Sequence, residues 1–379
     1  MAYKVTVQGP HVASEDAPDH RDSLLSQLKD IPKDITTLTL AEDPPSNSEW
    51  DILSSHFTSV RDLTMDSGWN EDLNDRKMPL HWPLERLTLS SPCGEVIESP
   101  HILQGRVRHL VLYLTSGLRF EGPTSPELTK TYQQAIERCA AEKQYLGESK
   151  IQLINTPELA VAWMKEKYTA VGEQEASASL EPDNRPVEGQ ESRMRTLEII
   201  ENDALDTFQR MSLALPHVIQ NLTSLTLHST NIVPDFNTLD EGLFLTLLPS
   251  LTNLTTLTLS IGESFHQPSS LPALFTRLPQ SLTTLHFRGP ISLIQSPRWE
   301  EWIAAFKSET YLPNLQHLAF VLDLHYTQEN ENGLKRPKPA PEKDLCQARA
   351  ACERVHEAAR NRGISIQPLS GAWADLILT

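Results

Sequence analysis

The sequence has little that points to chemistry or to a membrane. Its 379 residues include only four cysteines, and neither a CxxC pair nor a Cys/His cluster with zinc spacing occurs. No hydrophobic run approaches the roughly 18 residues that a membrane-spanning helix needs, and the first residues do not resemble a signal peptide. These absences favour a cytoplasmic or nuclear protein in a reducing compartment.

Positive charge is also scarce. The chain has 33 Lys and Arg residues against 50 Asp and Glu residues, which gives a net charge of −17 at neutral pH. An acidic surface repels nucleic acid and anionic lipid, so we expect neither as a partner. The motifs of a phosphate-binding loop, GxGxxG, GxSxG and HExxH are absent as well. We therefore expect that the protein is not an enzyme and that it binds neither a cofactor nor a metal.

What the sequence does have is one apolar pattern, repeated. In residues 250–260, SLTNLTTLTLS, the leucines are spaced by three, three and then two residues. Written as apolar-x-x-apolar-x-apolar, the pattern occurs nine times, at steps of 25, 24 and 23 residues in one run and 28, 32, 28 and 33 in a second. The copies begin at Ile35, Val60, Leu84, Val107, Met194, Leu222, Leu254, Leu282 and Leu315.

This pattern resembles the leucine-rich repeat, whose signature is L-x-x-L-x-L-x-x-N/C. The resemblance implies an α/β solenoid with a curved parallel sheet on the concave side and helices on the convex side. In each copy, two apolar residues lie two apart on a strand and point inward, while the residue between them faces out. The ninth-position Asn or Cys is missing, and the irregular spacing is similar to that of fungal F-box/leucine-rich-repeat-like proteins.

The repeats are interrupted once. Helical patterns at 124–146 and 156–168, followed by a polar acidic stretch at 172–192 that we expect to be disordered, predict an insertion between the two runs. The predicted divisions are an N-terminal strand/helix cap at 1–32, repeats at 33–115, inserted helices and an acidic loop at 116–192, repeats at 193–326, a linker at 327–343, and a C-terminal helix/strand cap at 344–379.

Outward positions of the later repeats carry the candidate binding residues. His286, Arg288 and His317 fall on successive predicted strands and would form a small cationic patch, which suits an acidic or phosphorylated peptide. The alternative is that a solvated sheet face simply carries mixed polar residues. The full set of predicted partner-binding residues is Thr226, His228, Thr258, His286, Arg288 and His317.

Stacked repeats present an extended surface, and no catalytic constellation competes with it. We therefore expect a monomeric, non-catalytic protein–protein interaction module or scaffold that binds a protein on its concave face. The resemblance implies an alternative, the substrate-recognition subunit of a ubiquitin ligase. An F-box would require several helices before the first repeat, whereas only residues 20–31 read as a helix there.

Overall fold

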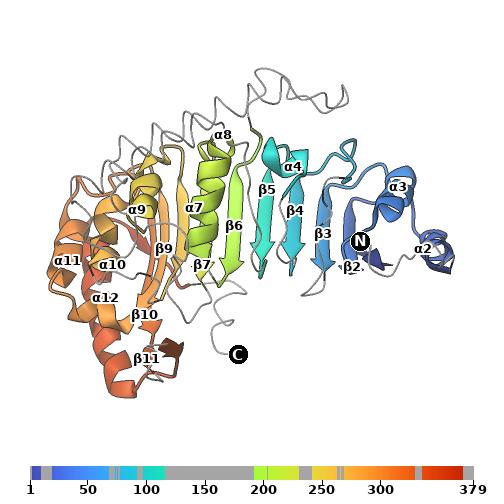
Figure 1. Cartoon of the computed structure of the whole chain (residues 1–379). Helices are drawn as coiled ribbons and strands as arrows, with labels where there is room; N and C mark the ends of the chain where they lie inside the picture. The colour runs from blue at the N-terminus through green and yellow to red at the C-terminus, as the bar shows by residue number, and fades with distance from the viewer. Residues whose placement is uncertain are drawn as a thin grey trace, which may run out of the picture. The chain divides into compact units, whose positions relative to one another are not determined.

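The structure is a computed structural model of the chain (Figure 1). It describes residues 2–9, 19–67, 73, 75, 77–91, 97–115, 192–202, 204–229, 241–262, 265, 269–328 and 335–369. The chain divides into two compact units, and one boundary between these units falls inside strand β6 (Thr196–Glu201), between Glu198 and Ile199. The predicted helices at 124–146 and 156–168, and all of the predicted acidic loop except Ser192, lie outside the described residues.

Each copy of the apolar pattern forms one strand. The hydrogen-bonded order of the eleven-stranded sheet is β1-β2-β3-β4-β5-β6-β7-β8-β9-β10-β13, so neighbouring strands follow one another along the chain. This arrangement of one strand per repeat confirms the predicted α/β leucine-rich-repeat fold. The strands are β1 (Ala2–Val7), β2 (Thr37–Glu42), β3 (Asp62–Ser67), β4 (Arg86–Ser90), β5 (His109–Tyr113), β6 (Thr196–Glu201), β7 (Ser224–Ser229), β8 (Thr256–Ser260), β9 (Thr284–Pro290), β10 (His317–Leu324) and β13 (Ser365–Ile366).

The register of the strands aligns the repeated leucines into rows. In the first unit, Leu38, Leu63, Leu87 and Leu110 are directly opposite one another on β2 to β5. In the second unit, the equivalent row runs through Leu225, Leu257, Leu285 and Leu318. All of these side chains are almost completely buried. A single repeat could not bury its apolar face, whereas stacked repeats share a continuous core.

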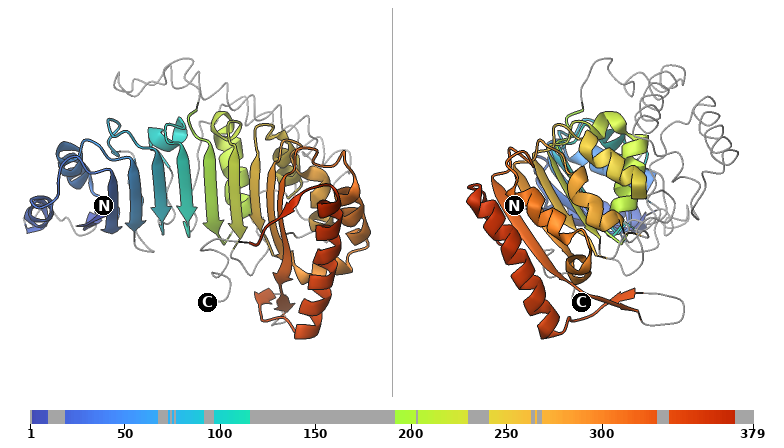
Figure 2. Two further views of the ribbon diagram at one scale, coloured as in Figure 1. Left: turned by 180° about the vertical axis from the view of Figure 1, so that it is seen from behind. Right: turned by 90° about the vertical axis from the view of Figure 1, so that its left-hand side faces the viewer.

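Helices cover the leucine side of the strands within each unit (Figures 1 and 2). Helix α3 (Asn47–His56) begins with a capping box, because Ser46 Oγ accepts from Glu49 N and the Glu49 carboxylate accepts from Ser46 N. The other helices are α2 (Asp19–Leu28), α4 (Pro100–Leu103), α7 (Ala204–Ala214), α8 (Pro216–Ile219), α9 (Glu241–Ser250), α10 (Ser270–Ala273), α11 (Trp299–Lys307) and α12 (Glu342–Asn361), with 3-10 helices η3 (Leu274–Arg277) and η4 (Ile291–Gln295).

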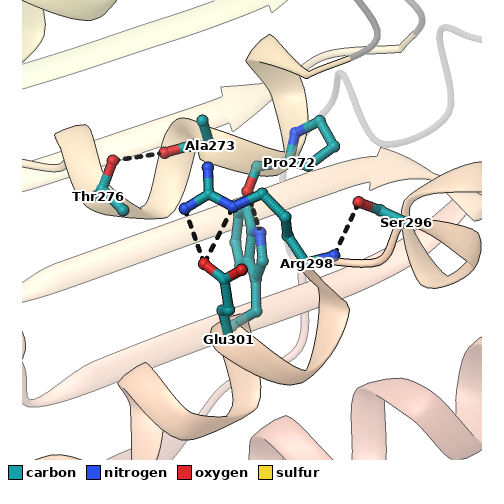
Figure 3. Close-up of polar contacts among 7 residues, drawn as sticks. Pro272, Ala273, Thr276, Ser296, Arg298 and Glu301 are labelled. Carbon is teal, nitrogen blue, oxygen red and sulfur yellow. Dashed lines mark hydrogen bonds and ion pairs between the residues drawn. The ribbon is translucent and has the colours of Figure 1, made fainter.

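Polar contacts lock α11 to the segment before it. The Arg298 guanidinium binds the Glu301 carboxylate at 2.8 Å and lies 5.2 Å from the ring centre of Phe275, and its backbone N–H donates to Ser296 Oγ (Figure 3). Beneath this exposed pair, Trp302 Nε1 donates to the carbonyl of Pro272 at 2.9 Å. The buried face of α11 is thereby held on the sheet of the second unit.

The two terminal strands of the sheet are covered in different ways. At β1, the side-chain amide of Gln27 on α2 accepts from Thr6 N at 3.0 Å and donates to Thr6 O at 3.1 Å, as a neighbouring strand would do. At the other end, α12 packs against β10, β13 and α11, with Ala348, Cys352 and Val355 buried. Gln27 satisfies backbone groups of β1 that would otherwise be free to pair with another molecule.

Candidate functional site

The six predicted binding residues lie on adjacent strands of the second unit. Thr226, Thr258 and His286 are directly opposite one another on β7, β8 and β9. Two residues further along the strands, His228 and Arg288 lie on either side of Ser260 in a second row. His317 on β10 lies opposite Thr284 and not opposite His286, whose partner is Ala319. The structure therefore brings the six residues together on one face of the sheet, with His317 offset from the patch.

Three of the six are not accessible. The exposed fractions of His228, Thr258 and Arg288 are 0%, 5% and 7%, whereas Thr226, His286 and His317 are half-buried. The alternation of side-chain direction along each strand predicts that these residues lie on the outer face. It does not predict whether other side chains cover that face. The expectation of a solvated face is therefore wrong for His228, Thr258 and Arg288. Whether any of the six contacts a partner stays a prediction.

The cationic patch is neutralised within the protein. Arg288 makes a bidentate ion pair with Asp323 on β10, with Nε–Oδ1 and Nη2–Oδ2 distances of 2.7 and 2.9 Å. Asp323 occupies an outward position of its strand, and the alternating run HLAFVLDL could have identified it as a partner. His317 Nδ1 lies 3.1 Å from the side-chain amide of Gln367, which follows β13. An acidic ligand would have to compete with Asp323 for Arg288.

Burial also keeps the imidazoles of this face neutral. Desolvation, assisted by the positive charge of Arg288, lowers the pKa of His228 from 6.5 to about 4. Desolvation is also the main cause of the lowered pKa of His286. Because a neutral imidazole adds no positive charge, these two residues do not form a cationic surface at neutral pH.

We expect the free energy of unfolding to fall as the pH is lowered from about 7.5 to about 5. Folding lowers the pKa of His228 from 6.5 to about 4, so the unfolded chain binds more protons in this range and stability decreases with falling pH. This histidine alone should account for a loss of about 2 kcal/mol by pH 5. Urea denaturation at the two pH values measures the change.

Replacing His228 with glutamine should reduce this pH dependence without abolishing it, because burial also lowers the pKa of His101 to about 4. The matched control is the same substitution at an exposed position, His81→Gln. If the His228→Gln variant shows the same dependence as the wild type, the neutral state assigned to His228 is wrong.

The first unit offers a different surface. We call the polar outward-facing residues of β2 to β5 the open face. All of them are exposed or half-buried, whereas Ala41 and Val111 on the same side are buried. Thr39, Thr64 and Thr88 form its central row. Two aspartates of β3, Asp62 and Asp66, lie on either side of that row. The open face comprises Thr37, Thr39, Asp62, Thr64, Asp66, Arg86, Thr88, Ser90, His109 and Tyr113.

One side-chain hydrogen bond lies at the far side of the open face. His109 Nε2 lies 2.6 Å from Glu198 Oε1, and the hydrogen bond from His109 is the main reason why the pKa of Glu198 is lowered, with the charge of Arg86 contributing less. In the sequence, the later repeats stand out because His and Arg gather there. The open face gives no such signal, because threonine and aspartate are typical of any solvated strand.

The described residues give little support for catalysis. Ser260 Oγ is buried and has no hydrogen-bond partner, so no base activates it. Burial raises the pKa of Cys352 to about 12, which keeps that thiol protonated and unreactive. No group of three or more His, Cys, Asp or Glu side chains in the described ranges could hold a metal ion. No described helix is both long enough and apolar enough to cross a membrane.

Comparisons with known proteins leave the function open. No protein-family model matches the sequence, and no curated protein matches it either. Among solved structures, the chain is similar to the leucine-rich repeat-containing protein LegL7 from Legionella pneumophila, with 12% sequence identity over 94% of this chain and 98% of that one. The TM-score of that superposition is 0.39.

Proposed function

We propose that this chain is a non-catalytic protein-binding module whose working surface is the open face of the first unit. One observation carries the proposal: polar side chains on β2 to β5 stay accessible in register, whereas His228, Thr258 and Arg288 on the equivalent face of the second unit are buried. A partner can reach only what is exposed. This moves the binding surface from the later repeats to the earlier ones.

The open face is suited to a polypeptide partner. Its side chains stand on hydrogen-bonded strands spaced about 4.8 Å apart, so they are held in position before a partner arrives. Threonine hydroxyls both donate and accept hydrogen bonds, and Asp62, Asp66 and Arg86 supply charges of both signs. Tyr113 adds an aromatic ring, a residue type enriched in protein interfaces.

An acidic or phosphorylated peptide on the later repeats stays a separate proposal. It would need Arg288 to leave Asp323, and it would gain nothing from His228 at neutral pH. The geometry therefore favours the open face over that surface.

Blocking the open face should abolish partner binding without unfolding the protein. Thr64 and Thr88 are adjacent and half-buried on β3 and β4, and tyrosine is compatible with a strand while filling the space above it. We expect the Thr64→Tyr/Thr88→Tyr variant to lose the partners that the wild type captures by affinity purification and mass spectrometry. Its thermal unfolding midpoint should stay within a few degrees of the wild type.

The matched control places two tyrosines on the exposed surface of α3. Asp51 and Ser55 are both exposed there, so Asp51→Tyr/Ser55→Tyr adds the same bulk away from the sheet and should retain every partner. Retention of all partners by the sheet variant would overturn the proposal.

The ubiquitin-ligase alternative predicts a further result of the same purification. A substrate-recognition subunit should capture the ligase adaptor through helices outside the open face, so the sheet variant should still hold the adaptor. Among the described residues before β2, the chain forms only β1 and the single regular helix α2. Nothing in that part of the chain favours this function over the general one.

A further inference from the structure

A short basic stretch stands out in this acidic chain. Lys335, Arg336 and Lys338 place three positive charges within four residues, in a protein whose net charge is −17. No other four consecutive residues of the sequence contain three Lys or Arg. Such a local reversal of charge is a candidate for recognition by a partner and has no place in the open face of the first unit.

The structure places this stretch outside the repeat sheet. Strands β11 (Tyr326–Gln328) and β12 (Lys335–Pro337) form a separate two-stranded antiparallel sheet between β10 and α12, with Thr327 opposite Arg336. Lys338 is exposed, and its backbone N–H donates to His325 O at 3.0 Å. Figure 2 shows the hairpin beside α12, away from the strands of the large sheet in its unit.

The backbone here is extended and weakly held. Two strands of three residues each make a hairpin of marginal stability in isolation, so separating them costs little. Pro337 lies between Arg336 and Lys338, and Pro339 and Pro341 follow at alternate positions. Proline fixes φ, lacks an N–H and disfavours helix for the residue before it, so the stretch stays extended up to the start of α12 at Glu342.

A partner that binds an extended basic segment must offer an acidic groove. Nucleic acid and anionic membrane would meet the negative field of the rest of the protein, which opposes their approach. A receptor protein whose groove contacts only the segment avoids most of that repulsion. Short Lys/Arg-rich segments of this kind act as nuclear localisation signals. We propose that residues 335–338, Lys-Arg-Pro-Lys, form a nuclear import signal that an acidic groove of an import receptor binds as an extended chain.

The test uses the full-length chain fused to two tandem fluorescent proteins, which prevents passive entry into the nucleus. We expect the wild type to accumulate in nuclei and the Lys335→Ala/Arg336→Ala/Lys338→Ala variant to be evenly distributed or excluded. The matched control, Lys29→Ala/Lys33→Ala/Lys307→Ala, removes the same charge from three exposed lysines outside the segment and should remain nuclear. Lys335→Arg/Lys338→Arg should also remain nuclear.

A binding measurement separates import from general attraction to anions. In fluorescence anisotropy with purified import receptor, the full chain should compete for a fluorescein-labelled peptide of residues 333–343, and the triple alanine variant should compete at least about tenfold less well, as expected for lost charge-assisted contacts. Nuclear accumulation by the triple variant, or an evenly distributed wild type, would overturn the proposal. So would competition by heparin with no binding to the receptor.

Discussion

Replacing Leu257 with aspartate should abolish cooperative folding of the second unit. Leu257 is fully buried, and it lies opposite Leu225 and Leu285 on the neighbouring strands. A carboxylate at this position would be surrounded by leucines and could not find a partner, so the cost should exceed about 4 kcal/mol. We expect loss of the unfolding transition in circular dichroism, or aggregation on purification.

The control substitution must be placed at a position of the outer face that is not buried. Thr258, the next residue, faces away from the leucines but is only 5% exposed, so it is a poor site for an added charge. Thr256 is half-buried on the same face of β8, and Thr256→Asp should lower stability by no more than about 1 kcal/mol. Equal thermal stability of the Leu257→Asp and Thr256→Asp variants would refute the assignment of leucines to the core.

The fold could be predicted from the sequence because burial and periodicity agree at every repeat. Apolar residues two apart require a strand with one buried face, and a third apolar residue before each strand fixes where it begins. A strand of this kind has few alternatives, since shifting the pairing by one residue would expose every leucine. The nine copies therefore determine nine strands, their parallel order and the leucine rows that fill the core.

The candidate site could not be predicted in the same way. Alternation identifies which side of the sheet a residue faces, and that held for His228 and Arg288. Exposure depends on what packs above the sheet, and pairing depends on the neighbouring strand, so neither the burial of His228 nor the Arg288–Asp323 pair follows from a local pattern. The stagger of His317 relative to His286 likewise depends on the register between β9 and β10, which repeat spacing does not give.

The packing of α11 depends on tertiary contacts as well as on the helical spacing of its apolar residues. The spacing of Trp299, Trp302 and Phe306 is typical of a helix with one apolar face, and the structure has α11 at Trp299–Lys307. The polar partner of Trp302 could not be inferred, because Pro272 lies thirty residues earlier in sequence and its carbonyl is brought close only by α10. An indole can be buried without cost only where such a partner exists.

Trp302→Ala should therefore be the most damaging truncation on the helix side. Trp302 is 1% exposed, and its ring lies 5.4 Å from those of Phe275 and Phe287 and 5.7 Å from that of Phe320, measured between ring centres. Truncation leaves a cavity among these rings, and removal of large aromatic side chains typically costs about 3–5 kcal/mol. It also leaves the Pro272 carbonyl without its donor, which adds about 1–3 kcal/mol.

Trp302→Phe separates the two contributions. Phenylalanine preserves most of the aromatic packing and cannot donate to Pro272, so its loss should lie near the cost of the hydrogen bond alone, about 1–2 kcal/mol. Urea denaturation followed by far-ultraviolet circular dichroism measures both variants against the wild type. If the alanine variant lost no more stability than the phenylalanine variant, the helix layer would have to be anchored by residues other than Trp302, and the contact with Pro272 would be its only contribution.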